Sequence, residues 1–479
     1  MIDVDRATGA LLMLTIGDAL GAPVDGLKGP HIRQLFGGQI KDYADARIPW
    51  SEKLHRWRLR GLHTGPAQQA FMMTEVLLDN ARWDARSAAE WLTLFGEPAP
   101  DLPHGLHRSA TRELRLALKR LREASPPLQS GTPSPSAEAA ARVAPLGVWF
   151  AETPDALIDA AMECALLTTT DARAILSAAV AALAVAAGLI HDTSKTAGAA
   201  AAARWIVSQA AALETRLNEL AERAGVTVSP DCAPVSGTIE SLPGLLEEGD
   251  ATLARQTLLN EANRHGPDHV ITSPNQPFAP MLVPAALWRA LSARSPLEAL
   301  IDAVNEGYDT PRACAITGAI VGARFGAGAA PAEWVAGLLG ADLAVVRGEA
   351  LAVKAPDPAR WDELYTVEYQ WTLRESTERQ ELARAHDREV ERRREKQTAH
   401  RQALQKVRPE SAPTRPGKPK SVPDPSVARS DEDRAALRRE RQQRDKQRGR
   451  EREHKRLRDR RSDFIARGRL ALEDRSENE

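Results

Sequence analysis

Three acidic residues and one arginine stand where the chain enters or leaves predicted helices, and they are the first candidates for chemistry. Asp18 lies near the end of an apolar N-terminal segment, Asp25 follows in a loop, and Asp309 precedes Arg312 by three residues. A loop carboxylate can exchange a proton with a substrate, whereas one just before a helix can cap its first amides. An arginine at that spacing can pair with the acid or bind a phosphate. The sequence leaves the structural and functional interpretations of each residue open.

Histidine and cysteine patterns typical of metal sites are absent from the sequence. No cysteine belongs to a CxxC pair, and four histidines show no metal-ligand spacing. We therefore expect surface histidines and a reduced, cytoplasmic protein without a disulfide framework. The residues concerned are Cys164, Cys232, Cys314, His63, His104, His107 and His191.

The composition favours a helical body and argues against a membrane span. The chain has 479 residues, enough for two or three domains, with 43% hydrophobic but only 4% aromatic residues. Together with abundant alanine, this is typical of closely packed helices rather than of a β-sandwich. The N-terminus lacks the basic region of a secretory signal. The most apolar window, Ala172–Leu189, contains Arg173, so we expect no membrane insertion.

Helical periodicity runs through the first part of the chain, without a run of strands or a strand–helix alternation. Several predicted helices begin at proline, which suits the first helical position. The sequence predicts an all-α domain over residues 1–340 and a connecting segment over 341–370. The predicted helices are Thr8–Leu20, Gln68–Asn80, Ser87–Phe95, Arg108–Glu123, Ala137–Arg142, Asp155–Leu167, Asp171–Ile190, Lys195–Arg223, Leu253–Asn263, Pro284–Leu291, Pro296–Val304 and Pro311–Phe325.

Residues 371–479 form a basic tail on an acidic body. The tail holds 32 Lys and Arg against 22 Asp and Glu, and Phe464 is its only aromatic residue after Trp371. Such a segment cannot bury enough apolar surface to fold as a globular domain. We expect charged helices over 376–405 and 430–462 with a disordered stretch between them. The tail is either a solvated helix, a ligand of nucleic acid or an acidic protein, or a segment that folds back on the body.

Four segments, in order, resemble the ADP-ribosylglycohydrolase family. Gly9–Gly26 is similar to the family's opening GALLGLAIGDALGAPVEG at nearly every position, and Gly307–Gly326 is similar to GGDTDTxAAIAGALxGAYYG. The resemblance covers about residues 1–340 and implies an all-α domain with a central cleft, in agreement with the predicted helices. The other two segments are Arg142–Gly147 with Leu167–Ala174, similar to RVAPLG and LTHxDPRA, and Val283–Trp288.

The resemblance implies hydrolysis of the bond between ADP-ribose and an acceptor, helped by two Mg²⁺ ions. In the family these ions are held by a (T/S)DDT motif and a DTDT motif, whose carboxylate and hydroxyl oxygens suit Mg²⁺. Here the first motif reads Thr64-Gly65-Pro66-Ala67 and the second reads Asp309-Thr310-Pro311-Arg312. Of six expected ligands, Thr64 and Asp309 remain, and Arg312 introduces a cation that repels Mg²⁺.

The resemblance also assigns roles to a small set of residues. Asp25, at the position of the family's loop glutamate, is the candidate catalytic residue. The candidate substrate-binding residues are Asp18, Gln68, Asp309 and Arg312, and the remnant of the metal site is Thr64 with Asp309. We expect no cofactor, because the magnesium site is lost, and an ADP-ribose-like small molecule as ligand.

Three functions follow from these assignments. In the first, the chain is a degenerate member of the family that keeps the cleft and binds an ADP-ribose-like ligand without hydrolysis. In the second, it is an active hydrolase with a rebuilt or metal-independent site around Asp25 and Asp309. In the third, the body is a scaffold and the basic tail binds a nucleic acid or an acidic protein.

Overall fold

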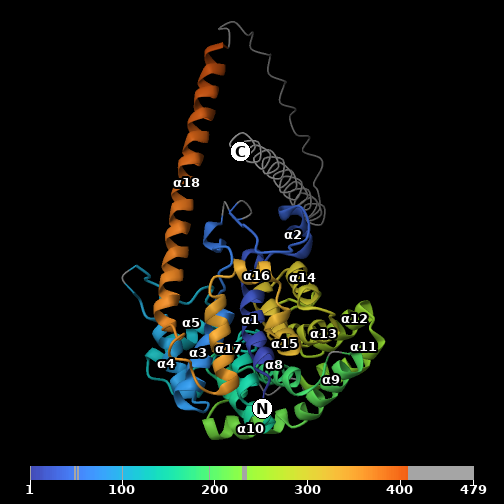
Figure 1. The fold of residues 1–479 in the computed structure, drawn as a ribbon. Helices are drawn as coiled ribbons and strands as arrows, with labels where there is room; N and C mark the ends of the chain where they lie inside the picture. The colour runs from blue at the N-terminus through green and yellow to red at the C-terminus, as the bar shows by residue number, and fades with distance from the viewer. Residues whose placement is uncertain are drawn as a thin grey trace, which may run out of the picture. The chain divides into compact units, whose positions relative to one another are not determined.

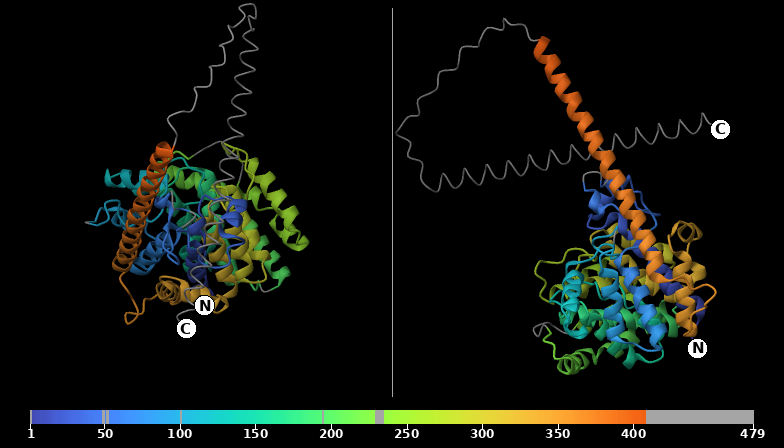
Figure 2. Two further views of the ribbon diagram at one scale, coloured as in Figure 1. Left: turned by 90° about the horizontal axis from the view of Figure 1, so that it is seen from above. Right: turned by 90° about the vertical axis from the view of Figure 1, so that its left-hand side faces the viewer.

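The computed structural model describes residues 2–47, 50, 53–99, 101–193, 195–228 and 235–407. These residues form eighteen α-helices and, apart from isolated bridges, no β-structure (Figure 1). The chain divides into two compact units, Met1–Gln380 and Glu381–Glu479. The first unit is a helical body in every view (Figure 2), so the all-α prediction is confirmed.

Two antiparallel helices, in backbone contact along their length, form the centre of the body (Figure 1). They are α1 (Val4–Gly21), which is buried from Ala7 onward, and α15 (Thr310–Phe325). Glycines face the backbone of the partner helix where the two come closest. A Cβ on Gly318 would lie 2.1 Å from the Met13 carbonyl oxygen, and a Cβ on Gly322 would lie 2.0 Å from the Gly9 carbonyl oxygen. The close contact of the two helices therefore leaves no room for a side chain at these glycines, and it places the end of α1 beside the start of α15.

The alanine-rich α8 (Ala172–Ile190) is a second core element, and Asp171 caps it by accepting a hydrogen bond from the Arg173 amide. Two helical segments, Val4–Val24 and α8, are long and apolar enough to cross a membrane. Both are buried inside the body, as core helices of globular domains are.

The remaining helices surround this core. The helix predicted over Lys195–Arg223 is two helices, α9 and α10, and the one predicted from Pro284 begins earlier, so that Pro284 lies inside α13. The segment Ala137–Arg142, predicted as a helix, forms turns. The bounds are α2 (Gly29–Phe36), α3 (Gly65–Asn80), α4 (Ala85–Gly96), α5 (Arg112–Arg122), α6 (Ala144–Trp149), α7 (Pro154–Leu166), α9 (Thr196–Ala210), α10 (Leu213–Ala224), α11 (Leu242–Glu248), α12 (Ala251–Asn263), α13 (Ala279–Ser292), α14 (Pro296–Glu306), α16 (Ala332–Gly337), α17 (Ala341–Val353) and α18 (Leu364–Val407).

The body extends past residue 340, where the sequence analysis ended it. Helix α17 lies in the segment 341–370 that was expected to be a connection, yet it packs against α1. Its Arg347 is fully buried, donates from Nε to Glu75 Oε1 on α3 at 2.9 Å, and caps the Asp362 carbonyl at 3.0 Å. A buried ion pair of this kind anchors the helix in the body, because removing either partner leaves a charge without compensation.

The first turns of α18 also belong to the body. Glu368 is fully buried and accepts from Arg108 Nη1 at 2.6 Å and Gln68 Nε2 at 2.8 Å, and it contacts His63 Nε2 at 2.7 Å. Two turns later, Glu375 accepts from the Leu59 amide at 3.0 Å. The buried face of α18 thus carries carboxylates where a core helix usually carries apolar side chains, and for this reason it resembled a solvated tail in the sequence.

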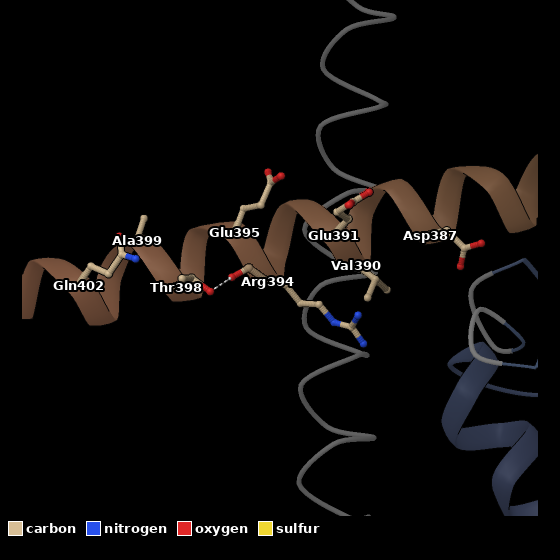
Figure 3. A pocket seen from close by; sticks show the side chains of 8 residues that line it. All are labelled: Asp387, Val390, Glu391, Arg394, Glu395, Thr398, Ala399 and Gln402. Atoms are coloured by element: carbon tan, nitrogen blue, oxygen red, sulfur yellow. Dashed lines mark hydrogen bonds between the residues drawn. The ribbon is translucent and has the colours of Figure 1, made fainter.

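The second unit is described only as far as Val407, as the exposed continuation of α18. A hollow of about 760 Å³ runs along it, and Figure 3 shows that its described lining residues, Asp387 to Gln402, all come from this one helix. Exposed pairs such as Arg393 with Glu389, 3.0 Å apart, line the helix as expected for a solvated face. The helix predicted over 430–462 lies outside the described residues.

Two truncations test the revised boundary. A chain that ends at Gln380 should keep the thermal midpoint of the full chain, because every buried contact of α18 is retained. A chain that ends at Arg360 should lose about 5 kcal/mol of unfolding free energy or fail to fold, since Arg108, Gln68 and His63 would lose Glu368. Thermal unfolding followed by circular dichroism measures the midpoint of each chain. Equal midpoints for the two chains would contradict the boundary at Gln380.

Candidate functional site

Asp18 lies fully buried on α1 and caps the N-terminus of α3 from outside that helix. Its Oδ2 accepts from the amides of Thr64 and Ala67 at 2.8 and 3.0 Å, and its Oδ1 accepts from the Thr64 hydroxyl at 2.6 Å. Thr64 itself makes no side-chain cap. Burial raises the pKa of Asp18, although His63 and these hydrogen bonds oppose the rise. The structure therefore gives Asp18 a structural role, one of the two that the sequence left open.

Thr64 and Gln68, which belong to the degenerate first motif, also form hydrogen bonds in the protein interior. Both are fully buried. The Gln68 amide accepts from the Arg108 backbone at 2.8 Å and donates to the Leu106 carbonyl at 3.1 Å and to Glu368. With its polar atoms satisfied, Gln68 is placed as a link between α3 and α18, not as an open ligand contact.

His63 is a correction to the sequence analysis, which expected it at the surface. The ring is fully buried, with Nε2 on Glu368 and with the edges of Phe71 and Trp371 at 5.4 and 5.6 Å between ring centroids. The Arg108 and His63 charges hold the pKa of Glu368 at about 2, against the opposing effect of burial. The residues just before Thr64 are thus locked to α18.

At the start of α15, Arg312 forms ion pairs with two carboxylates. Its Nη1 lies 2.9 Å from Asp309 Oδ1, and its Nε lies 2.8 Å from Glu138 Oε2. Asp309 occupies the N-cap position of α15, but its side chain caps no amide and turns to Arg312 instead. Asp309 is therefore the N-cap residue of α15 by position, as one alternative expected, but its carboxylate forms the ion pair with Arg312 that the other alternative expected.

Glu138 is the member of this site that the sequence analysis missed. It is buried, and its second oxygen, Oε1, accepts from Gln69 Nε2 at 2.7 Å, while Gln69 accepts from Arg142 Nη1 at 2.7 Å. Burial alone would raise the pKa of Glu138, but Arg312, Gln69 and Arg142 outweigh it and leave the pKa below its ordinary value. A chain of polar contacts therefore runs from Arg312 to Arg142. In the sequence, the position of Glu138 is marked only by a single acidic residue within a run of alanines.

The acids at the start of α15 are engaged by Arg312 rather than free to bind a magnesium pair. Mg²⁺ needs several carboxylate or water oxygens in an octahedral arrangement, whereas the two acids here already bind a guanidinium. Among the described residues, no group of three or more His, Cys, Asp or Glu side chains could hold a metal. The donor set at the start of α15 fits an arginine and does not fit Mg²⁺.

Asp25 lies beside the Arg312 cluster because its loop is tied to the loop before α15. The Gly26 amide donates to the Tyr308 carbonyl at 2.7 Å, and the Tyr308 amide donates to the Leu27 carbonyl at 2.6 Å. Gly26 has φ of +73°, a conformation that favours glycine. This short ladder places the Asp25 and Asp309 carboxylates near enough for the charge of Asp25 to raise the pKa of Asp309.

Three arginines face the partly exposed Asp25. Burial raises its pKa, and the charges of Arg312, Arg56 and Arg58 oppose the rise. Arg56 lies over the Trp50 ring at 4.6 Å and donates to the Asp25 carbonyl oxygen at 3.1 Å, while Arg58 donates to the Ser109 hydroxyl at 3.0 Å. The region therefore combines one carboxyl that can hold or accept a proton with guanidinium groups suited to an anion.

Comparisons with known proteins agree on the fold. The sequence model of a family described as ADP-ribosylglycohydrolase matches residues 2–371, a range that includes Glu368. An uncharacterized protein of Archaeoglobus fulgidus is 25% identical over 336 residues, which cover 70% of this chain and 92% of that protein. A solved chain of an ADP-ribosylglycohydrolase-related protein complex has a TM-score of 0.50 at 23% identity and covers 74% of this chain and 98% of its own length. The structural likeness supports the fold alone.

Replacement of Asp18 and Asp25 should separate a structural from a functional carboxylate. Asp18→Ala leaves three donors of α3 without an acceptor and should cost about 3 kcal/mol of unfolding free energy. Asp25→Ala, at a partly exposed loop residue, should change it by less than about 1 kcal/mol. Urea unfolding of the two variants measures both effects, and equal losses would show that Asp25 too is a structural residue.

Glu368→Gln should reveal an acid-sensitive part of the stability. Because folding lowers the Glu368 pKa from its ordinary value of 4.5 to about 2, the ionised group stabilises the fold above pH 4.5, and this contribution disappears as the pH falls toward 2. The difference in unfolding free energy between wild type and variant should shrink by about 2 kcal/mol from pH 6 to pH 3. Glu378→Gln, an exposed residue of the same helix, is the control. A pH-independent difference would contradict the ion-pair account.

Proposed function

This chain belongs to the ADP-ribosylglycohydrolase family, and from that membership we propose that it binds an ADP-ribose-like ligand beside Asp25 without metal-dependent hydrolysis. The observation that carries the proposal is the ion pairing of Arg312 with Asp309 and Glu138. A guanidinium stays charged at any physiological pH. Two of the oxygen groups nearest the second motif are therefore engaged by a permanent cation, which competes with a divalent ion for the same place.

The arginines around Asp25 support a phosphate-bearing ligand. ADP-ribose carries a diphosphate, and a guanidinium binds phosphate oxygens through two parallel hydrogen bonds. Arg56 and Arg58 are only partly buried, so a ligand can reach them from solvent. Asp25, between them and Arg312, is the natural acceptor for a sugar hydroxyl. We therefore assign the phosphates to Arg56 and Arg58 and the ribose to Asp25.

A residual metal-independent hydrolase is the second candidate, and the raised pKa of Asp25 favours it. A carboxyl that keeps its proton nearer to neutrality can serve as a general acid for the departing group. Asp309 is less available to assist as a base, because its carboxylate is already paired with Arg312. The two candidates differ in one observable, the release of free ADP-ribose from an ADP-ribosylated protein in the presence of EDTA.

Calorimetric titration of the full chain with ADP-ribose tests the binding proposal. We expect the same affinity with Mg²⁺ and with EDTA. Arg58→Gln should weaken binding about tenfold through the loss of a charged hydrogen bond. Arg264→Gln, which removes an exposed arginine paired only with Glu261, should leave it unchanged. No binding by wild type, or equal effects of the two variants, would overturn the proposal.

A combined variant tests the loss of the metal site. Gly65→Asp, Pro66→Asp, Pro311→Asp and Arg312→Thr together restore the acids and hydroxyl of the two motifs and remove the competing cation. Glu138→Gln accompanies them, because Arg312→Thr would leave Glu138 buried without a counter-ion. Calorimetry should show Mg²⁺ binding to this variant and none above weak surface binding to wild type. Tight binding of two ions by wild type would refute the proposal.

A further inference from the structure

A cavity of about 670 Å³ opens at the C-terminal ends of α13 and α15. Residues of α14, the first residue of α9 and the segment from the end of α11 to the start of α12 complete its wall. Asp309 and Arg312 stand at the other end of the 16-residue α15, about 20 Å away along the helix axis. The cavity is therefore separate from the region around Asp25, and its volume lies in the range of small-molecule pockets.

Arg324 supplies the cavity with a cation that no acid compensates. Its Nε donates to the Thr193 carbonyl at 2.8 Å, and its Nη1 donates to the Ala290 and Ala293 carbonyls at 2.9 and 2.7 Å. All three partners are neutral, and among the described residues no carboxylate forms an ion pair with Arg324. Burial accordingly lowers the pKa of Arg324 to about 10, which is the expected effect on a cation without a counter-ion.

The other charges that line the cavity are paired. Arg289 Nε lies 2.7 Å from Asp302 Oδ2, and Arg294 Nη2 lies 3.2 Å from Glu298 Oε1. Glu247 lies 2.6 Å from Arg204, which stands outside the lining. After these pairs are set aside, Arg324 remains as one positive charge in the cavity.

Trp288 adds a hydrogen-bond donor without an acceptor. The indole Nε1 is buried and has no hydrogen-bond partner within the described part of the chain. Trp288 also ends the segment Val283–Trp288, one of the four that carry the family resemblance and one that the region around Asp25 does not use. A buried N–H without an acceptor costs free energy, so a shift of the ring that lets a ligand oxygen accept from the N–H would be favoured.

Part of the remaining wall is apolar and carries an aromatic ring. Leu246, Leu291 and Ala293 line it, and the Phe325 ring lies against the Arg324 guanidinium at 4.5 Å. Aromatic and aliphatic walls favour a flat apolar body, whereas a bare phosphate carries more charge than one guanidinium balances.

We propose that this cavity binds a small organic monoanion, a flat apolar body bearing one carboxylate that accepts from Arg324 and Trp288. The carboxylate matches the single uncompensated charge, and the body fills the space between Leu246, Leu291 and Phe325. The assignment does not depend on the ligand proposed at Asp25, since no lining residue is shared with that region.

Calorimetry of the full chain with 2-naphthoate tests the proposal. We expect saturable binding at one site, and at least tenfold weaker binding of the neutral analogue 2-naphthol and of inorganic phosphate. Trp288→Phe keeps the ring and removes the donor, so it should weaken naphthoate binding about fivefold. Arg324→Gln should weaken it about tenfold or more and abolish the preference for naphthoate over naphthol.

Two controls keep the outcome interpretable. Asp25→Ala should leave naphthoate binding unchanged, and Trp288→Phe should leave ADP-ribose binding unchanged, so failure at one region is distinguished from failure at the other. Because Arg324 also holds the end of α13, its variant counts only if its thermal midpoint stays near that of wild type; Trp288→Phe is decisive otherwise. Equal affinity for naphthoate and naphthol, or unchanged naphthoate binding in Trp288→Phe, would overturn the proposal.

Discussion

The backbone contact between the antiparallel helices α1 and α15 is the constraint on which the rest of the body depends. Gly9, Gly318 and Gly322 allow the two helices to approach until a carbonyl of one lies where a Cβ of the other would be. This close approach fixes the end of α1 beside the start of α15. The capping carboxylate of Asp18, the loop of Asp25 and the Arg312 cluster therefore meet at one place, although about 290 residues of chain separate them.

Two networks of charge act on this place from different sides. Toward the interior, Glu368 holds His63, Gln68 and Arg108 and fixes the segment that leads into α3. Toward the loop of Asp25, Glu138 and Asp309 hold Arg312. Both networks bury carboxylates, and both are stable only because each carboxylate is matched by a cation and by hydrogen bonds. The protein thus keeps acids at the family's site but uses them to bind its own side chains.

Local patterns in the sequence predicted the helices of the core and offered the pairing of Arg312 with Asp309, three residues apart, as one of two alternatives for that arginine. The contacts that the sequence did not reveal join residues far apart in the chain. Glu138 meets Arg312 across 174 residues and Glu368 meets His63 across 305, and nothing in the spacing of either acid indicates a partner. Helix α18 was misassigned for a related reason, because its buried positions carry Glu368, Thr372 and Glu375 and therefore have the pattern of a solvated helix.

The guanidinium of Arg312 also changes how this site relates to its surroundings. A magnesium site obtains its positive charge by binding an ion from solution. Its occupancy therefore follows the concentration of free ion and falls when nucleotides or chelators compete for that ion. Arg312 is part of the chain and is present in every copy of the protein. The positive charge that Arg312 supplies at the start of α15 therefore does not depend on the concentration of free magnesium.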